Sequence, residues 1–135
     1  MKVVLDTNIF LSGLMLPDSQ PGKILSAWRS AAFDLVLSEP MLLEITRVLA
    51  YPKIRKRIDW SAEEIEHFVS LLRFNAEIVN IDGVDAVVPR DADDAPVLAA
   101  LIASHADCLV SGDQDLLSLK EHYAIETVAE FVRRL

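Results

Sequence analysis

The stretch KVVLDTNIF, residues 2 to 10, places an aspartate directly after a short apolar run. Val3, Val4 and Leu5 have the character of a buried strand, and Asp6 ends it. A carboxylate in this place has two explanations. It caps the helix that follows, or it binds a cation. The rest of the chain has to distinguish between them.

Short apolar runs alternate with amphipathic segments outward from this stretch, which predicts an α/β protein with a parallel sheet covered on both faces. Strands are expected at residues 2–5, 34–38, 76–81 and 107–112 and near Ile125. Helices are expected at 7–16, 21–33, 62–74 and 96–104, after Pro40 with Leu43, Val48 and Leu49, after Asp113, and at the C-terminus. Ser61 and Glu64 predict a capping box for the helix at 62–74, and residues 52–60 are interpreted as a basic connection.

The bulk composition suits one domain over residues 1–135, with 52% hydrophobic residues and a mean hydropathy of +0.29. Cys108 is the single cysteine, so an intrachain disulfide is excluded, and we expect a buried thiol rather than a reactive one. No apolar run reaches the ~20 residues that span a bilayer, and the first residues do not resemble a secretory signal. These features predict a cytoplasmic protein with no membrane partner.

The net charge of −8 argues, taken alone, against a nucleic-acid partner, because phosphate binding favours a basic surface. Acidic residues gathered around a cation would give the same total. The positions of the acidic residues therefore matter more than their sum.

Ligands of open parallel sheets bind beyond the carboxyl ends of the strands, and several carboxylates fall there. Asp6 and Asp94 each precede a predicted helix, and so does Asp113, so each could be only a helix cap. Glu44 lies beside an apolar helix face, where it would be paired with Arg47 or bound to a cation.

Carboxylates that converge on one sheet edge repel one another unless a cation lies among them, and their oxygens suit Mg²⁺ or Mn²⁺. A zinc site is not indicated, because His67, His105 and His122 are scattered and are expected at the surface or at helix ends. Glycine-rich phosphate loops are absent from the sequence.

Four segments in order resemble PIN-domain proteins, especially the VapC-like toxins of toxin–antitoxin pairs. They are VVLDTNIFLSGL, EITRVL, RDADDAPVLAAL and CLVSGDQDLL, and the resemblance runs from residue 3 to about 128. It implies a Rossmann-like three-layer α/β/α sandwich with a mostly parallel central sheet. It also implies a nuclease that cuts RNA with Mg²⁺ or Mn²⁺.

Carried over by position, the family's catalytic and metal-binding carboxylates correspond to Asp6, Glu44, Asp94 and Asp113. Asp94 best matches the aspartate that opens the family's helix, with Asp91 as the fallback, and Asp93 also competes for this place. Supporting roles are expected for the remaining polar residues of these segments, namely Asn8, Ser111, Asp91 and Asp115.

The resemblance predicts a metal-dependent ribonuclease, as the toxin of a toxin–antitoxin pair with a small antitoxin partner and a homodimeric or larger assembly. RNA contact is expected from the run Lys53, Arg55, Lys56 and Arg57, for which a solvated charge run is the alternative. Two alternatives for the whole protein are an RNA-processing PIN nuclease outside such a pair and a catalytically idle partner-binding module. A phosphatase with a nucleophilic aspartate is disfavoured, because DTN lacks a second aspartate two residues after Asp6.

Overall fold

The computed structural model describes residues 1–89 and 92–135. In this part of the chain five strands form one all-parallel sheet in the order β3-β2-β1-β4-β5. The strands are β1 (Lys2–Leu5), β2 (Asp34–Ser38), β3 (Glu77–Val79), β4 (Cys108–Val110) and β5 (Ile125–Glu126). All five carboxyl ends therefore point the same way.

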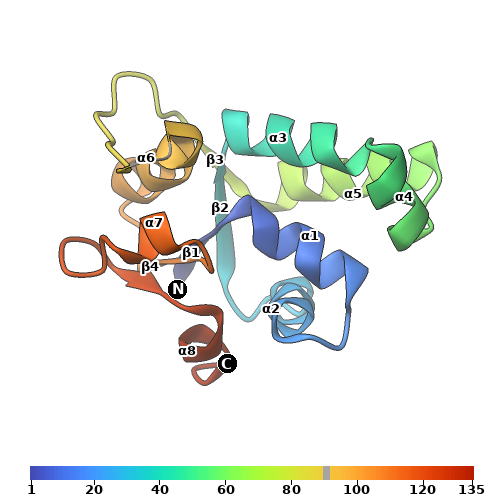
Figure 1. Ribbon diagram of the computed structural model, residues 1–135, viewed down its shortest axis with the longest axis horizontal. Helices are drawn as coiled ribbons and strands as arrows, with labels where there is room; N and C mark the ends of the chain where they lie inside the picture. The colour runs from blue at the N-terminus through green and yellow to red at the C-terminus, as the bar shows by residue number, and fades with distance from the viewer. Residues whose placement is uncertain (90–91) are drawn as a thin grey trace.

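Helices cover both faces of the sheet and make it a three-layer α/β/α sandwich (Figure 1). In Figure 1, α3, α5 and α6 lie above the sheet and α2 and α8 lie below it, while α1 runs outward between the two layers. The helices are α1 (Thr7–Met15), α2 (Gln20–Arg29), α3 (Glu39–Leu49), α4 (Pro52–Ile58), α5 (Ala62–Asn75), α6 (Ala95–Ser104), α7 (Gln114–Leu117) and α8 (Val128–Val132), with a 3₁₀ turn at Ala92–Asp94 before α6.

Apolar strands and specific helix caps account for this arrangement. The side chains of β1, β2 and β4 are almost wholly buried, as expected for the central strands of a parallel sheet. The predicted capping box begins α5: the Glu64 N–H donates to Ser61 Oγ (3.2 Å), and the Ser61 N–H donates to Glu64 Oε1 (3.3 Å). Close packing of α1 on α2 requires Gly13, where a Cβ would lie 2.9 Å from the Pro21 carbonyl oxygen of α2.

Three sequence-based expectations were wrong in detail. The interpretation of residues 52–60 as a connection fails because Pro52–Ile58 forms α4, which packs its partly buried Ile54 and Ile58 against the core. The helix predicted to reach Phe33 ends at Arg29, because Ala31 adopts a φ of 61° that breaks it. Leu43, expected among the apolar residues of its helix, is 60% exposed.

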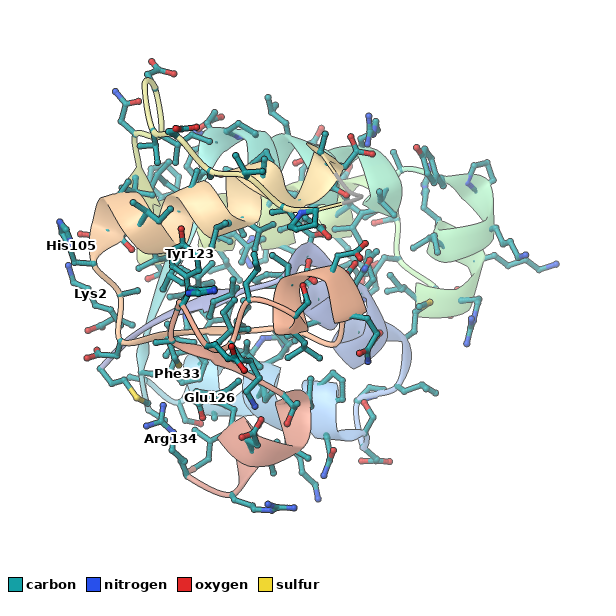
Figure 2. The ribbon with its side chains drawn as sticks, turned by 60° about the vertical axis from the view of Figure 1, so that its left-hand side comes forward. Lys2, Phe33, His105, Tyr123, Glu126 and Arg134 are labelled. Atoms are coloured by element: carbon teal, nitrogen blue, oxygen red, sulfur yellow. The ribbon has the colours of Figure 1, made fainter. Side chains whose placement is uncertain are left out.

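The chain ends meet at the amino edge of the sheet, at the opposite end from the residue-6 position. Arg134 Nη2 donates to Glu126 Oε2 (2.8 Å) and lies 3.4 Å from both Cys108 Sγ and Met1 Sδ. Figure 2 shows Arg134 and Glu126 next to each other. The Cys108 thiol is buried, as predicted.

None of the helices within residues 1–89 and 92–135 combines the length and the apolar character that crossing a membrane requires.

Candidate acidic site

Asp6 lies buried at the carboxyl end of β1. Its side chain is 2% exposed, and its N–H continues the sheet by donating to the Val110 carbonyl oxygen (3.0 Å). One carboxylate oxygen, Oδ2, accepts a hydrogen bond from the Ser111 hydroxyl (2.8 Å). The other, Oδ1, accepts a long hydrogen bond of 3.4 Å from the Thr7 hydroxyl. The shorter of the two side-chain hydrogen bonds to the carboxylate therefore comes from the residue that follows the neighbouring strand, β4.

Helix capping does not explain Asp6. The residue stands at the N-cap position of α1, but its side chain makes no capping hydrogen bond. The N–H groups of Thr7 and Asn8 lie close enough to lower the pKa of Asp6 without meeting hydrogen-bond geometry. Asn8 itself is exposed on the first turn of α1. Of the two explanations for a carboxylate after β1, the cap is thus the weaker.

Asp113 is joined to Asp6 through Ser111. The Ser111 hydroxyl that donates to Asp6 also accepts from the Asp113 N–H (2.9 Å). The Asp113 carboxylate does cap a helix, because its Oδ1 accepts from the Asp115 N–H (2.7 Å) at the start of α7. The loop after β4 therefore brings Asp113 to Asp6, and Asp115 supports it through its backbone.

The electrostatics of this pair favour a cation. Burial raises the pKa of Asp6 above its ordinary value, the Ser111 hydrogen bond opposes that rise, and the Asp113 carboxylate adds to it by repulsion. In the part of the chain that the structure describes, the four ion pairs of lysine or arginine involve other acidic residues, so no described basic side chain neutralises Asp6. A buried carboxylate beside a second one is costly unless a positive charge accompanies it.

Glu44 lies on α3 across a pocket from the turn that precedes α6. The pocket has a volume of about 500 Å³, and Glu44 is half-buried in its wall. Asp93 lines the same pocket, together with Arg47, the residue considered as an ion-pair partner of Glu44. The structure thus brings Glu44 and Asp93 to one groove. Its other lining residues are Pro40, Leu43, Ala92 and Pro96.

Asp94 stands at the N-cap position of α6, is half-buried, and makes no capping hydrogen bond with its side chain. It is not among the residues that line the groove beside Glu44. Asp91, the fallback for this role, lies outside the described residues.

A cluster of three ligands is not formed by the described side chains. Within residues 1–89 and 92–135, no three histidine, cysteine, aspartate or glutamate side chains lie close enough together to hold a metal ion. Magnesium does not require three, because it commonly keeps several waters and binds through one or two carboxylates plus substrate phosphates. The hard oxygens of Asp6 and Asp113, with no described basic partner at Asp6, fit that chemistry.

The basic run forms helix α4, which lies at the far end of α3 from the sheet (Figure 1). Lys53, Lys56 and Arg57 are exposed, and Arg55 is half-buried. Helix α4 also packs on α1, which begins directly after Asp6 and is about 13 Å long at 1.5 Å per residue. The basic helix is therefore one short helix away from the acidic site.

The sequence did not lead us to single out Ser38 as a site residue. It ends β2, is fully buried, and its hydroxyl has no hydrogen-bond partner among the residues that the structure describes. Val4 pairs with Val36, so two residues further on Asp6 is level with Ser38. The sequence does contain a signal that could have identified Ser38, because a serine stands at the end of an apolar strand predicted to neighbour the strand before Asp6.

Fold and site together define an α/β/α protein with an acidic site at the carboxyl edge of a parallel sheet. Comparison with known proteins then gives the family: residues 2–115 match the PIN domain profile, and the chain belongs to the PIN domain family. PIN domains are generally nucleases, and this is a nuclease-type fold. The chain is also 32% identical over 143 aligned residues to the uncharacterized protein MJ1680 of Methanocaldococcus jannaschii, covering 98% of this chain and 90% of that protein.

Proposed function

We propose that the protein is a metal-dependent ribonuclease that hydrolyses phosphodiester bonds in RNA with Mg²⁺ or Mn²⁺. The observation that carries this proposal is Asp6, a carboxylate 2% exposed at the carboxyl edge of the sheet, with its pKa raised and no described basic partner. Its proximity to Asp113 and the membership in a family of nucleases support the same reading.

Asp6 and Asp113 would hold the cation, with Glu44 and Asp94 on the neighbouring helices as further ligands or as acceptors for bound water. When bound, the cation would lower the pKa of a water molecule and stabilise charge that develops on the phosphate. Ser111 fixes the Asp6 carboxylate through the 2.8 Å hydrogen bond to its Oδ2. Glu44 or Asp94 would accept the proton of the attacking water.

The Asp6→Asn variant tests the assignment. It keeps the side-chain shape and an oxygen that can accept from Ser111, but it removes the negative charge. We expect at least a hundredfold loss of RNA cleavage in Mg²⁺ or Mn²⁺, measured on a labelled single-stranded RNA, with an unchanged circular dichroism spectrum.

Asp34→Asn is the matched control, since Asp34 begins β2 at the opposite edge of the sheet and is exposed. It should cleave like the wild type. Cleavage by Asp6→Asn at the wild-type rate, or cleavage by the wild type in excess EDTA, would contradict the proposal.

We also propose that this nuclease acts as the toxin of a toxin–antitoxin pair, as the VapC-like resemblance implies. The groove beside Glu44 offers an exposed apolar side chain, Leu43, next to acidic groups, which suits a peptide inhibitor carrying a basic residue. Exposed Leu71 and Phe74 on α5 offer apolar area for a homodimer. Induction in a bacterial host should arrest growth, and the Asp6→Asn variant should not; growth arrest by both would separate toxicity from cleavage.

A further inference from the structure

A buried hydroxyl stands beside Asp6 on the side away from Ser111. Ser38 is fully buried, and no residue in the described part of the chain accepts or donates a hydrogen bond to its Oγ. It also stands at the N-cap position of α3 without capping that helix. A buried hydroxyl without a partner costs roughly 1–3 kcal/mol, so its presence calls for a group that completes its hydrogen bonding.

The strand register places this hydroxyl in line with Asp6. Val4 pairs with Val36, and Leu5 pairs with Val110, so continuing the register past the paired residues brings Asp6 level with Ser38 on one side and with Ser111 on the other. The backbone of both Asp6 and Ser38 is extended, with ψ of 143° and 161°. Residues at one level of parallel strands point to the same face, and adjacent strands lie about 4.8 Å apart.

The two serines flank the carboxylate but differ in their bonding. Ser111 donates to Asp6 Oδ2 at 2.8 Å, whereas Ser38 makes no hydrogen bond within the described residues. The second Asp6 oxygen, Oδ1, has the Thr7 hydroxyl at 3.4 Å as its nearest side-chain donor. One serine therefore fixes the carboxylate, and the other is left for a molecule that arrives at the site.

We propose that Ser38 is a positioning residue of the acidic site, whose hydroxyl hydrogen-bonds a water in the hydration shell of the cation held beside Asp6. This inference rests on the proposed function. Mg²⁺ and Mn²⁺ sites that use few protein ligands retain waters, and groups that hold such outer ligands tune the affinity for the metal. The role differs from that of Ser111, which acts on the protein's own carboxylate.

The test is Mn²⁺ binding by the full chain, measured by calorimetry without RNA, together with thermal unfolding in EDTA. We expect Ser38→Ala to weaken Mn²⁺ binding about tenfold, the lower end of what loss of an outer-shell partner costs. In EDTA its unfolding temperature should equal or exceed that of the wild type, because no hydrogen bond within the protein is lost.

Ser111→Ala is the matched control, with the same atoms removed on the other side of Asp6. It should lower the unfolding temperature in EDTA, because it leaves a buried carboxylate oxygen without its donor. Ser38→Thr and Ser38→Val form a second pair of equal shape, of which only threonine keeps the hydroxyl and should keep the Mn²⁺ affinity. If the added methyl group unfolds both, Ser38→Ala alone decides.

Wild-type Mn²⁺ affinity in Ser38→Ala would overturn the inference, as would equal affinities in folded Ser38→Thr and Ser38→Val. A loss of stability in EDTA as large as that of Ser111→Ala would also overturn it, because the hydroxyl would then be structural. Asp6→Asn separates the two proposals: if it binds Mn²⁺ like the wild type, the metal site itself is wrong. If Asp6→Asn loses Mn²⁺ while Ser38→Ala keeps it, only the role of Ser38 fails.

Discussion

Burial at single residues decides which groups carry charge in this protein. Asp6 and Cys108 are both almost wholly buried, and burial raises the pKa of each. For Asp6, burial makes the charged carboxylate costly, and a cation beside it would offset that cost. For Cys108 it preserves the neutral thiol, and the Glu126 carboxylate raises the pKa further, against the opposing effect of Arg134. The same physical cause therefore makes one residue a site candidate and the other inert.

The Cys108 thiol predicts a pH dependence of stability. Its pKa rises from 9.0 to about 12 in the folded protein, so the unfolded chain loses this proton first as the pH rises. The folded state then binds more protons, and stability falls as the pH rises from about 9 towards 12, by about 1 kcal/mol at pH 10. Urea unfolding at pH 8, 9 and 10 measures this slope.

Cys108→Ala supplies the control for that slope, since it cannot ionise. Its cavity lowers stability at every pH, so the slopes are compared rather than the absolute free energies of unfolding. A slope between pH 8 and 10 that is the same in both proteins would contradict the prediction. Alkylation of the native wild type should also be slow at pH 8, because the thiolate is the reactive form.

At the scale of elements, most of the fold follows from local pattern. Buried strands, prolines in first turns and the Ser61–Glu64 capping box each mark an element that the structure confirms. Helix α4 escaped prediction because its four basic residues dominate its composition, although Ile54 and Ile58 stand one turn apart and both pack on the core. Local charge thus masked a helical spacing.

The site was less predictable than the elements. The placement of Asp6 and Asp113 after strands follows from sequence, because parallel strands bring their carboxyl ends to one edge. The hydrogen bond from Ser111 to Asp6 joins residues 105 positions apart, and the level row with Ser38 depends on strand register. Neither can be read from local periodicity.

The basic residues of α4 lead to a prediction about how salt affects RNA binding. Replacing Arg55 and Arg57 by glutamine should weaken binding to single-stranded RNA and lower the slope of log affinity against log salt by about 1.4, if each contacts one phosphate. Glutamine keeps the helix propensity. Fluorescence anisotropy with the RNA-cleavage variant Asp6→Asn, over a range of salt concentrations, measures both quantities.

A control with the same change of net charge replaces Lys23 and Arg133, which are exposed on other elements. This double variant should change the salt slope much less. If the α4 variant binds RNA at low salt as well as the protein without these changes, the alternative holds, and the basic residues are only a solvated charge run.

For the molecule as a whole, the order of strands in the sheet determines which loops and chain ends lie beside each end of β1. Strand β1 lies at the centre between β2 and β4, so its carboxyl end is surrounded by loops that carry acidic groups and its amino end by the chain ends. Arg134 contacts Met1 beside the amino end of β1, Glu126 in β5, and the Phe131 ring, 5.6 Å from its guanidinium carbon. One exposed side chain therefore joins α8, β5 and β1.

Arg134→Gln should loosen α8 more than it destabilises the whole domain. The Arg134 side chain is 46% exposed, although the Phe131 ring beneath it is buried, so the ion pair and the ring contact together contribute about 1 kcal/mol or less. Hydrogen exchange should rise in α8 while the strands stay protected. Arg133→Gln, at a neighbouring arginine that makes no described ion pair, should leave that exchange unchanged; equal effects of both variants would argue against a specific contact.

Residue 1 and residue 134 touch, while Asp6 follows the far end of β1, about 16 Å from residue 1 at 3.3 Å per residue. The two ends of the chain therefore lie close together, on the side of the molecule away from the acidic site (Figure 1). A short linker could join the two ends. New chain ends at the exposed turn around Gly83 would then give a circular permutant with the same spatial order of strands. Cargo attached at the original ends would point away from any bound RNA.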